Sequence, residues 1–113
     1  LLKMSVEEAG FAVLEEAVDK TELLQSCIRK NPDVVILDLD LPLNESVRLV
    51  EDLLDIDPTV SIIAMSDLVE GFSERVLAAG ARAFLQKPFS MYDLIDLIRK
   101  VAPDKSLRNA SQV

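Results

Sequence analysis

The sequence contains no histidine and no tryptophan, only one cysteine, and few aromatic side chains, four Phe and one Tyr. The lack of histidine excludes Ser-His and Cys-His catalysis and any zinc site with a histidine ligand. A single cysteine, Cys27, excludes an internal disulfide, and its helical context indicates a buried apolar side chain rather than a reactive thiol. With half of the residues apolar and so few of them aromatic, the core must be mostly aliphatic.

Positive charge is also scarce, because 12 Lys and Arg stand against 20 Asp and Glu, for a net charge of −8. Such a surface repels both the phosphate backbone of nucleic acids and anionic membranes. No apolar run approaches the roughly 18 residues of a membrane-spanning helix, and no signal peptide is visible. We therefore expect a cytoplasmic domain that binds neither nucleic acid nor membrane by itself.

The length of 113 residues fits a single domain. Patterned sequence covers residues 1–101, which we expect to form the domain, whereas residues 102–113 are polar and predict a tail or linker. The first residue is Leu, and the first residues have the pattern of a helix already under way. We therefore expect the domain to be incomplete at its N-terminus, with the sequence beginning inside a longer protein.

Helical and extended patterns alternate along the chain. They predict helices over residues 1–9, 20–30, 45–55, 69–79 and about 90–101, and strands over residues 11–17, 34–37, 60–65 and 83–86. The strands at 34–37 and 60–65 are almost wholly apolar without alternation, which is typical of a parallel sheet covered on both faces. We therefore predict an α/β fold, a doubly wound parallel sheet flanked by helices on both faces.

Local patterns add detail to the helices. Asp19 with Glu22, and Ser90 with Asp93, have the spacing of capping boxes. Gly71 falls inside the helix predicted over residues 69–79 and should weaken it by about 1 kcal/mol relative to Ala. The apolar positions expected to face the core are Leu23, Leu24, Cys27 and Ile28 in one helix, Val47, Val50, Leu53 and Leu54 in the next, and Leu94, Leu97, Ile98 and Val101 in the last.

Three polar residues directly follow predicted strands: Asp38, Ser66 and Lys87. In an open parallel sheet the functional site lies at the carboxyl ends of the strands, so these residues should share one edge. A carboxylate is a competent nucleophile toward phosphorus, while an ammonium and a hydroxyl can stabilise the oxygens of a transferring phosphoryl group. Taken one at a time, each residue also has an ordinary structural explanation: Asp38 suits a helix cap, Ser66 a turn and Lys87 a solvated loop. Jointly they favour phosphoryl chemistry, with Mg²⁺ as the expected cation.

Two segments resemble bacterial response-regulator receiver domains. Residues 32–42 (PDVVILDLDLP) resemble the phosphoacceptor segment of that family, and residues 80–89 (GARAFLQKPF) resemble its last-strand segment. The resemblance covers about residues 1–101. It implies the strand order 2-1-3-4-5 and a cis bond between Lys87 and Pro88. It also implies a phosphorylation-controlled switch rather than a metabolic enzyme.

The resemblance implies roles for individual residues. Asp38 would accept a phosphoryl group from the histidine of a sensor kinase or a histidine phosphotransfer protein, Lys87 would pair with that group, and Ser66 would move toward it. Phe84 stands where the family has an aromatic that changes rotamer with phosphorylation, although a plain core residue fits the sequence equally well. Mg²⁺ would be held by Asp38, by the main-chain carbonyl of Asp40 and by an acidic pair on the family's first strand.

The sequence departs from the family in four places. The first strand and its acidic pair are absent, and Glu7 and Glu8 do not replace them because they lie on the predicted first helix; either the chain is shortened or another chain supplies the strand by swapping. Asp67 stands where the family usually has a small residue, and its charge should repel an incoming phosphoryl group. Ser46 replaces a usual Gly, so the local loop should differ. A serine rather than a threonine at the switch position is a mild change.

Three functions remain open at this level. The leading hypothesis is a phosphorylatable receiver that uses Asp38 and Mg²⁺. The second is a degenerate receiver, a protein-interaction module that takes no phosphate, which Asp67 favours. A small flavin-binding domain of similar topology is the third, but the sequence lacks a Gly/Ser/Thr-rich phosphate loop and ring-stacking aromatics near the strand ends. The last helix could also support a homodimer, although a solvated helix is equally compatible with its pattern.

Overall fold

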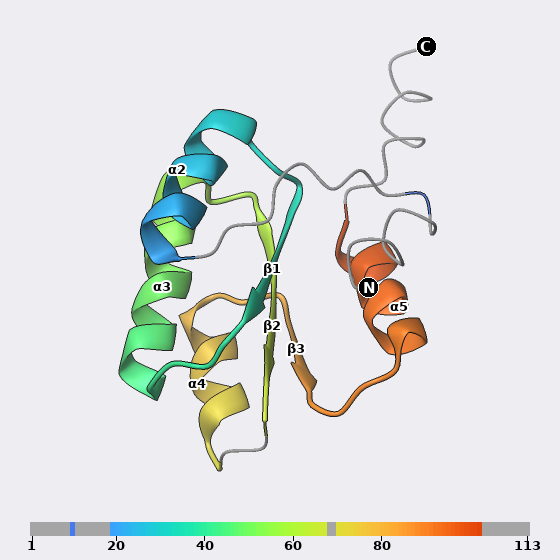
Figure 1. Cartoon of the computed structure of the whole chain (residues 1–113). Helices are drawn as coiled ribbons and strands as arrows, with labels where there is room; N and C mark the ends of the chain where they lie inside the picture. Colours follow the sequence, from blue (N-terminus) through green and yellow to red (C-terminus); the bar gives the residue numbers. More distant parts are fainter. Residues whose placement is uncertain (1–9, 11–18, 68–69, 103–113) are drawn as a thin grey trace.

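The computed structural model in Figure 1 describes Gly10, residues 19–67 and residues 70–102. The helix predicted over residues 1–9, the strand predicted over residues 11–17 and residues 103–113 of the predicted tail lie outside the described residues. Within the described part, no helix is long and apolar enough to cross a membrane.

The described residues form a parallel sheet of three strands in the order β1-β2-β3. The strands are β1 (Val34–Asp38), β2 (Ser61–Ser66) and β3 (Ala83–Gln86), and the helices are α2 (Lys20–Lys30), α3 (Leu43–Ile56), α4 (Phe72–Ala79) and α5 (Met91–Val101). Figure 1 shows α2, α3 and α4 on one side of the sheet and α5 on the other. The predicted α/β fold is therefore confirmed, with the described strands in the place of the last three of the order 2-1-3-4-5.

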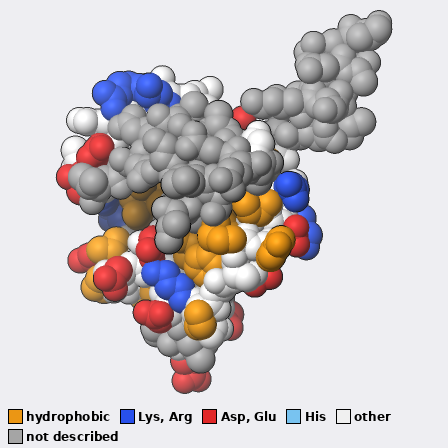
Figure 2. All heavy atoms as spheres, turned by 45° about the vertical axis from the view of Figure 1, so that its right-hand side comes forward, with side chains coloured by type: hydrophobic (Ala, Val, Ile, Leu, Met, Phe, Trp, Pro, Cys, Tyr) orange, Lys and Arg blue, Asp and Glu red, His pale blue; other side chains and the backbone are white. Residues whose placement is uncertain are grey.

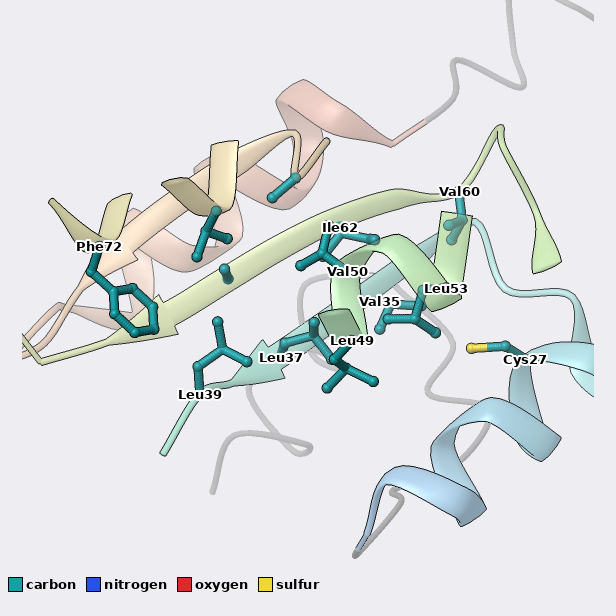
Figure 3. Close-up of a cluster of buried hydrophobic side chains, with 13 residues drawn as sticks. Cys27, Val35, Leu37, Leu39, Leu49, Val50, Leu53, Val60, Ile62 and Phe72 are labelled. Carbon is teal, nitrogen blue, oxygen red and sulfur yellow. The ribbon is translucent and has the colours of Figure 1, made fainter. Parts of the chain in front are cut away.

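The strands alternate their side chains between two cores. Ile62 and Ala64 of β2 belong to the larger cluster, on the side of α2, α3 and α4, whereas Ile63 and Met65 belong to the smaller cluster beneath α5. Every residue of β2 is buried, because this strand is central and covered on both faces. Figure 3 shows the larger cluster, with the labelled side chains Val35, Leu37, Leu49, Val50, Leu53, Ile62 and Phe72 converging between the sheet and the helices.

The smaller cluster is less fully enclosed by described residues. Val34, Ile36, Leu85 and Leu97 pack against it while remaining partly exposed. Figure 2, turned so that the α5 side of Figure 1 comes forward, shows hydrophobic side chains gathered on this face among charged ones. The hydroxyl of Ser61, at the start of β2, donates a hydrogen bond of 2.9 Å to the carbonyl of Val101 at the end of α5. The start of β2 is therefore tied to the end of α5.

Several local predictions need correction. Ile28 is 66% exposed, so the inward stripe of α2 ends at Cys27. In α3, Leu49 is buried although it was not among the predicted core positions, whereas Val47, which was, is only partly buried. Gly71 does not lie inside a helix: it is the N-cap of α4, with a φ of 78° that suits glycine. Helix α3 begins two residues earlier than predicted, after Pro42, and β2 is displaced by one residue.

Ser46, for which the sequence predicted an altered loop, lies in a helix. Ser46 lies within α3, is completely buried, and its hydroxyl donates to the carbonyl of Leu41 at 3.4 Å. Among the described residues other than glycine, only Asn31 has a positive φ. A serine therefore satisfies this position, because the backbone there is helical and demands no glycine.

The helix caps follow the sequence closely. The side chain of Asp19 accepts a hydrogen bond of 2.8 Å from the backbone N–H of Glu22. Ser90 and Asp93 form both halves of the predicted capping box at the start of α5. These contacts satisfy N–H groups that have no partner within the helix, each with a stabilisation of about 1 kcal/mol.

Gly80 ends α4 in close approach to α3. Its φ is 122°, and a Cβ built there would overlap Cδ1 of Leu54. Gly71, at the other end of α4, also has a positive φ, but a Cβ there would meet nothing within 4 Å. Both glycines therefore have a backbone angle that strains other residues, and only Gly80 also has a side chain in the way of a Cβ.

We predict that Gly80→Ala lowers the free energy of unfolding by about 2–4 kcal/mol, because it adds overlap with Leu54 to the backbone strain. Gly71→Ala, the matched control, should cost only about 1–2 kcal/mol, because it adds strain alone. Urea unfolding of the full chain measures both. An equal loss of stability in the two variants would show that the contact between Gly80 and Leu54 is unimportant.

Candidate functional site

The register of the parallel strands brings their carboxyl ends to one edge of the sheet. Asp38 is paired with Met65, and Ser66 is paired with Gln86. Backbone hydrogen bonds extend past the strand ends: the N–H of Leu39 donates to the carbonyl of Met65, and the N–H of Lys87 donates to that of Ser66, both at 2.8 Å. The main chain therefore fixes the positions from which the polar side chains of this edge extend.

The structure brings Asp38 and Lys87 into direct contact. Nζ of Lys87 donates to Oδ1 of Asp38 at 2.6 Å, across 49 residues of sequence. The side chains are 57% exposed for Asp38 and 34% exposed for Lys87, so solvent and solutes reach the pair. The peptide bond between Lys87 and Pro88 is cis.

Three carboxylates act on the Lys87 ammonium. The hydrogen bond that Lys87 donates to Asp38 is the main cause that raises the pKa of Lys87 above its usual value, and the charges of Asp38, Asp67 and Asp40 add to this rise. Partial desolvation of the amine works against this rise. The site therefore favours the protonated lysine, the form that stabilises a phosphoryl group.

Ser66 and Phe84 lie on neighbouring strands, but Phe84 is paired with Ala64, two residues before the edge at which Ser66 lies. Ser66 is the last residue of the central strand and is only 5% exposed, with the strands that lead to Asp38 and Lys87 on its two sides. Phe84 is partly buried against the larger core cluster, and its ring centroid lies 6.1 Å from that of Phe72, at 49° between the planes. The aromatic partner on α4 was not expected from the sequence, because no local pattern links residues 72 and 84.

The described residues at this edge include oxygen donors that are candidates for a metal site. Asp38 offers a solvent-exposed carboxylate, and exposed Asp40 follows two residues later, after the buried Leu39. These oxygen donors are of the kind that Mg²⁺ prefers. Within residues 19–67 and 70–102, however, no group of three or more Asp, Glu, Cys or His side chains is arranged to hold a metal ion. The donors fit the chemistry of Mg²⁺, but they form an incomplete set.

Comparison with known proteins identifies the family. The family model described as "Response regulator receiver domain" matches residues 1–99, and the chain belongs to that family. It is a receiver domain of the two-component signalling type. Members of this family interact with histidine kinases, and they generally bind Mg²⁺.

Individual relatives agree with this assignment. The chain is 27% identical over 103 residues to the chemotaxis protein CheY of Thermotoga maritima, covering 90% of this chain and 86% of that protein. It is 36% identical over 97 residues to the transcriptional regulatory protein PdtaR of Mycobacterium tuberculosis, covering 82% of this chain but only 45% of that protein. A CheY-like receiver domain protein from Methanospirillum hungatei JF-1 is similar in structure, with a TM-score of 0.78 and 27% identity over 88% of this chain and 79% of that one.

We predict that Asp38→Asn lowers the pKa of Lys87, because the hydrogen-bonded charge that favours the ammonium is removed. The Lys87 amine can be titrated by NMR of its ε-methylene and Nζ resonances. In the parent chain, the pair contributes to stability below the ordinary lysine pKa of about 10.4 and loses this contribution as pH rises through the higher pKa of Lys87.

Asp55→Asn is the matched control for this titration. Asp55 is exposed near the far end of α3, a helix about 20 Å long that starts beside the site. This variant removes the same charge and should leave the Lys87 titration almost unchanged. An equal shift in both variants would mean that net charge, rather than the contact with Asp38, sets the pKa.

Proposed function

We propose that this chain is a phosphoacceptor receiver in which Asp38 takes a phosphoryl group from the phosphohistidine of a sensor kinase or a histidine phosphotransfer protein. The observation that carries the proposal is the 2.6 Å contact between Lys87 Nζ and Asp38 Oδ1. An acid and an amine from separate strands meet there at a solvent-exposed edge, where a protein-borne phosphoryl group can approach. The proposed protein is a switch, with at most self-catalysed transfer and loss of its own phosphoryl group.

The proposed transfer follows from the site's geometry. The ion pair uses Oδ1 of Asp38, and we assign the attack on phosphorus to Oδ2. The new bond joins this oxygen to phosphorus while the bond from phosphorus to the donor's imidazole nitrogen breaks, and the nitrogen keeps the electron pair. Lys87, displaced from Asp38, then donates to a phosphoryl oxygen. When bound through Asp38, the carbonyl of Asp40 and water, Mg²⁺ would neutralise part of the charge on that group.

Ser66 and Phe84 provide a route from the site to α4. The hydroxyl of Ser66 is proposed to move toward a phosphoryl oxygen and form a new hydrogen bond there. Phe84 would shift with it, and its ring packs near Phe72 at the start of α4. The proposed response is therefore a displacement of α4, a short helix bounded by two glycines with positive φ. A change of this kind biases an existing two-state element.

A second candidate is a receiver that binds partners without taking phosphate. Two observations favour it: the described residues contain no cluster of three metal-binding side chains, and Asp67 adds a negative charge that acts on Lys87. An acidic pair on a strand upstream of this sequence would favour the switch, and its absence would favour the interaction module. A flavin-binding function is not retained, since the chain belongs to the receiver family. Homodimerisation and a cytoplasmic location remain proposals.

We predict that a small phosphoryl donor with Mg²⁺ adds one phosphate to the parent chain and none to Asp38→Asn, which has lost the nucleophilic oxygen. Intact-protein mass spectrometry after acid quenching measures the added mass. Chelation of Mg²⁺ should slow labelling of the parent. Asp55→Asn, which removes a carboxylate far from the site, should label at the parent rate.

Two results would contradict the proposal in different ways. If Asp38→Asn labels as well as the parent, the acceptor is another residue. If the parent fails to label with either a small donor or a phosphorylated histidine kinase, the interaction module becomes the better description.

A further inference from the structure

Asp67 lies beside the phosphoacceptor pair without belonging to it. It directly follows Ser66, whose carbonyl accepts the 2.8 Å hydrogen bond from the backbone N–H of Lys87. The main chain thus fixes the backbone of Asp67 close to that of Lys87, and Asp67 is exposed. Its charge acts on the Lys87 ammonium, as those of Asp38 and Asp40 do.

The balance of these charges is unfavourable for an incoming anion. The charges of three acidic residues, Asp38, Asp40 and Asp67, act on one ammonium, which leaves two formal negative charges in excess. Asp38 is needed as the proposed nucleophile, and the proposed role of Asp40 uses its main-chain carbonyl. The charge of Asp67 has no such part in the reaction, and its main effect on an approaching phosphoryl donor is repulsion.

We propose that Asp67 determines which phosphoryl donors this receiver accepts, by disfavouring free, doubly charged small molecules relative to less charged donors. The inference rests on the proposed function of Asp38. A protein donor gains docking contacts that offset the repulsion, whereas a diffusing dianion has few such contacts. Asp67 thus limits phosphorylation that does not come from a partner protein.

The repulsion has two signatures that a purely structural role would lack. It scales with the donor's charge, so a dianion is affected more than a monoanion. It also falls with ionic strength, because Asp67 is exposed and the Debye length shrinks from about 30 Å at 0.01 M to about 3 Å at 1 M salt. A change in local packing would alter the rate equally at every salt concentration.

The test measures initial rates of labelling of the full chain by acetyl phosphate, a dianion near neutral pH, and by phosphoramidate, mainly a monoanion. Both rates are followed at constant Mg²⁺ in low and high salt. Asp67→Asn keeps the shape of the side chain and removes its charge. It should label about five- to tenfold faster than the parent with acetyl phosphate at low salt. The gain should be about two- to threefold with phosphoramidate and should approach unity for both donors near 1 M salt.

Two control variants isolate the charge at this position. Asp67→Glu keeps the charge and should label at nearly the parent rate. Asp55→Asn changes the net charge equally at the far end of α3, so it should also leave both rates almost unchanged. A faster rate in Asp55→Asn equal to that in Asp67→Asn would overturn the inference, because the effect would then belong to the net charge of the chain.

The remaining outcomes separate this inference from the proposed function. Equal or slower labelling of Asp67→Asn, with the parent labelling on Asp38, overturns the inference alone. A gain that is independent of salt and of donor charge also overturns it, in favour of a steric role for Asp67. No labelling of parent or variant by either donor overturns the proposed function, and the inference falls with it.

Discussion

The central strand β2 is the element on which the rest of the structure depends. It pairs with β1 on one side and β3 on the other, and all six of its residues are buried. Its apolar side chains enter both cores, and each large one contributes about 1.5–3 kcal/mol by its burial. Its last residue, Ser66, lies at the functional edge, and its first residue, Ser61, binds the carbonyl of Val101. One strand thus sets the positions of the site and of the end of α5.

The ion pair of Asp38 and Lys87 contributes little to this framework. The side chain of Asp38 is 57% exposed and that of Lys87 is 34% exposed. Exposed ion pairs typically add only about 0.2–1 kcal/mol to stability. The backbone bonds from Leu39 to Met65 and from Lys87 to Ser66 hold the edge without it. Its geometry therefore argues for chemistry rather than for folding, and variants at the site can be compared as folded proteins.

The sequence predicted the layers and the approach of Asp38 and Lys87 because both follow from short-range patterns. Unbroken apolar runs such as residues 34–37, which precede Asp38 in β1, indicate a strand covered on both faces. Parallel pairing then aligns the residues at the ends of the strands. The contact between Phe72 and Phe84 could not be predicted, because it depends on where α4 lies on the sheet. Ile28 continues the apolar stripe of α2 by spacing, yet it lies at the exposed end of the helix. Tertiary packing decided these cases.

The two faces of the sheet differ in the helices that pack on them. Phe84 packs against the larger cluster, in which Phe72 and Val76 of α4 take part, whereas α5 packs on the smaller cluster through Leu94 and Ile98. Because β2 and β3 separate the clusters, a movement of Phe84 acts first on α4. Helix α4 is also the shortest of the described helices, with only eight residues. Short helices owe most of their stability to packing, so a shift of one packed ring has a larger effect there than on α5, which has a complete capping box. The fold therefore places α4, rather than α5, on the side of the sheet against which Phe84 packs.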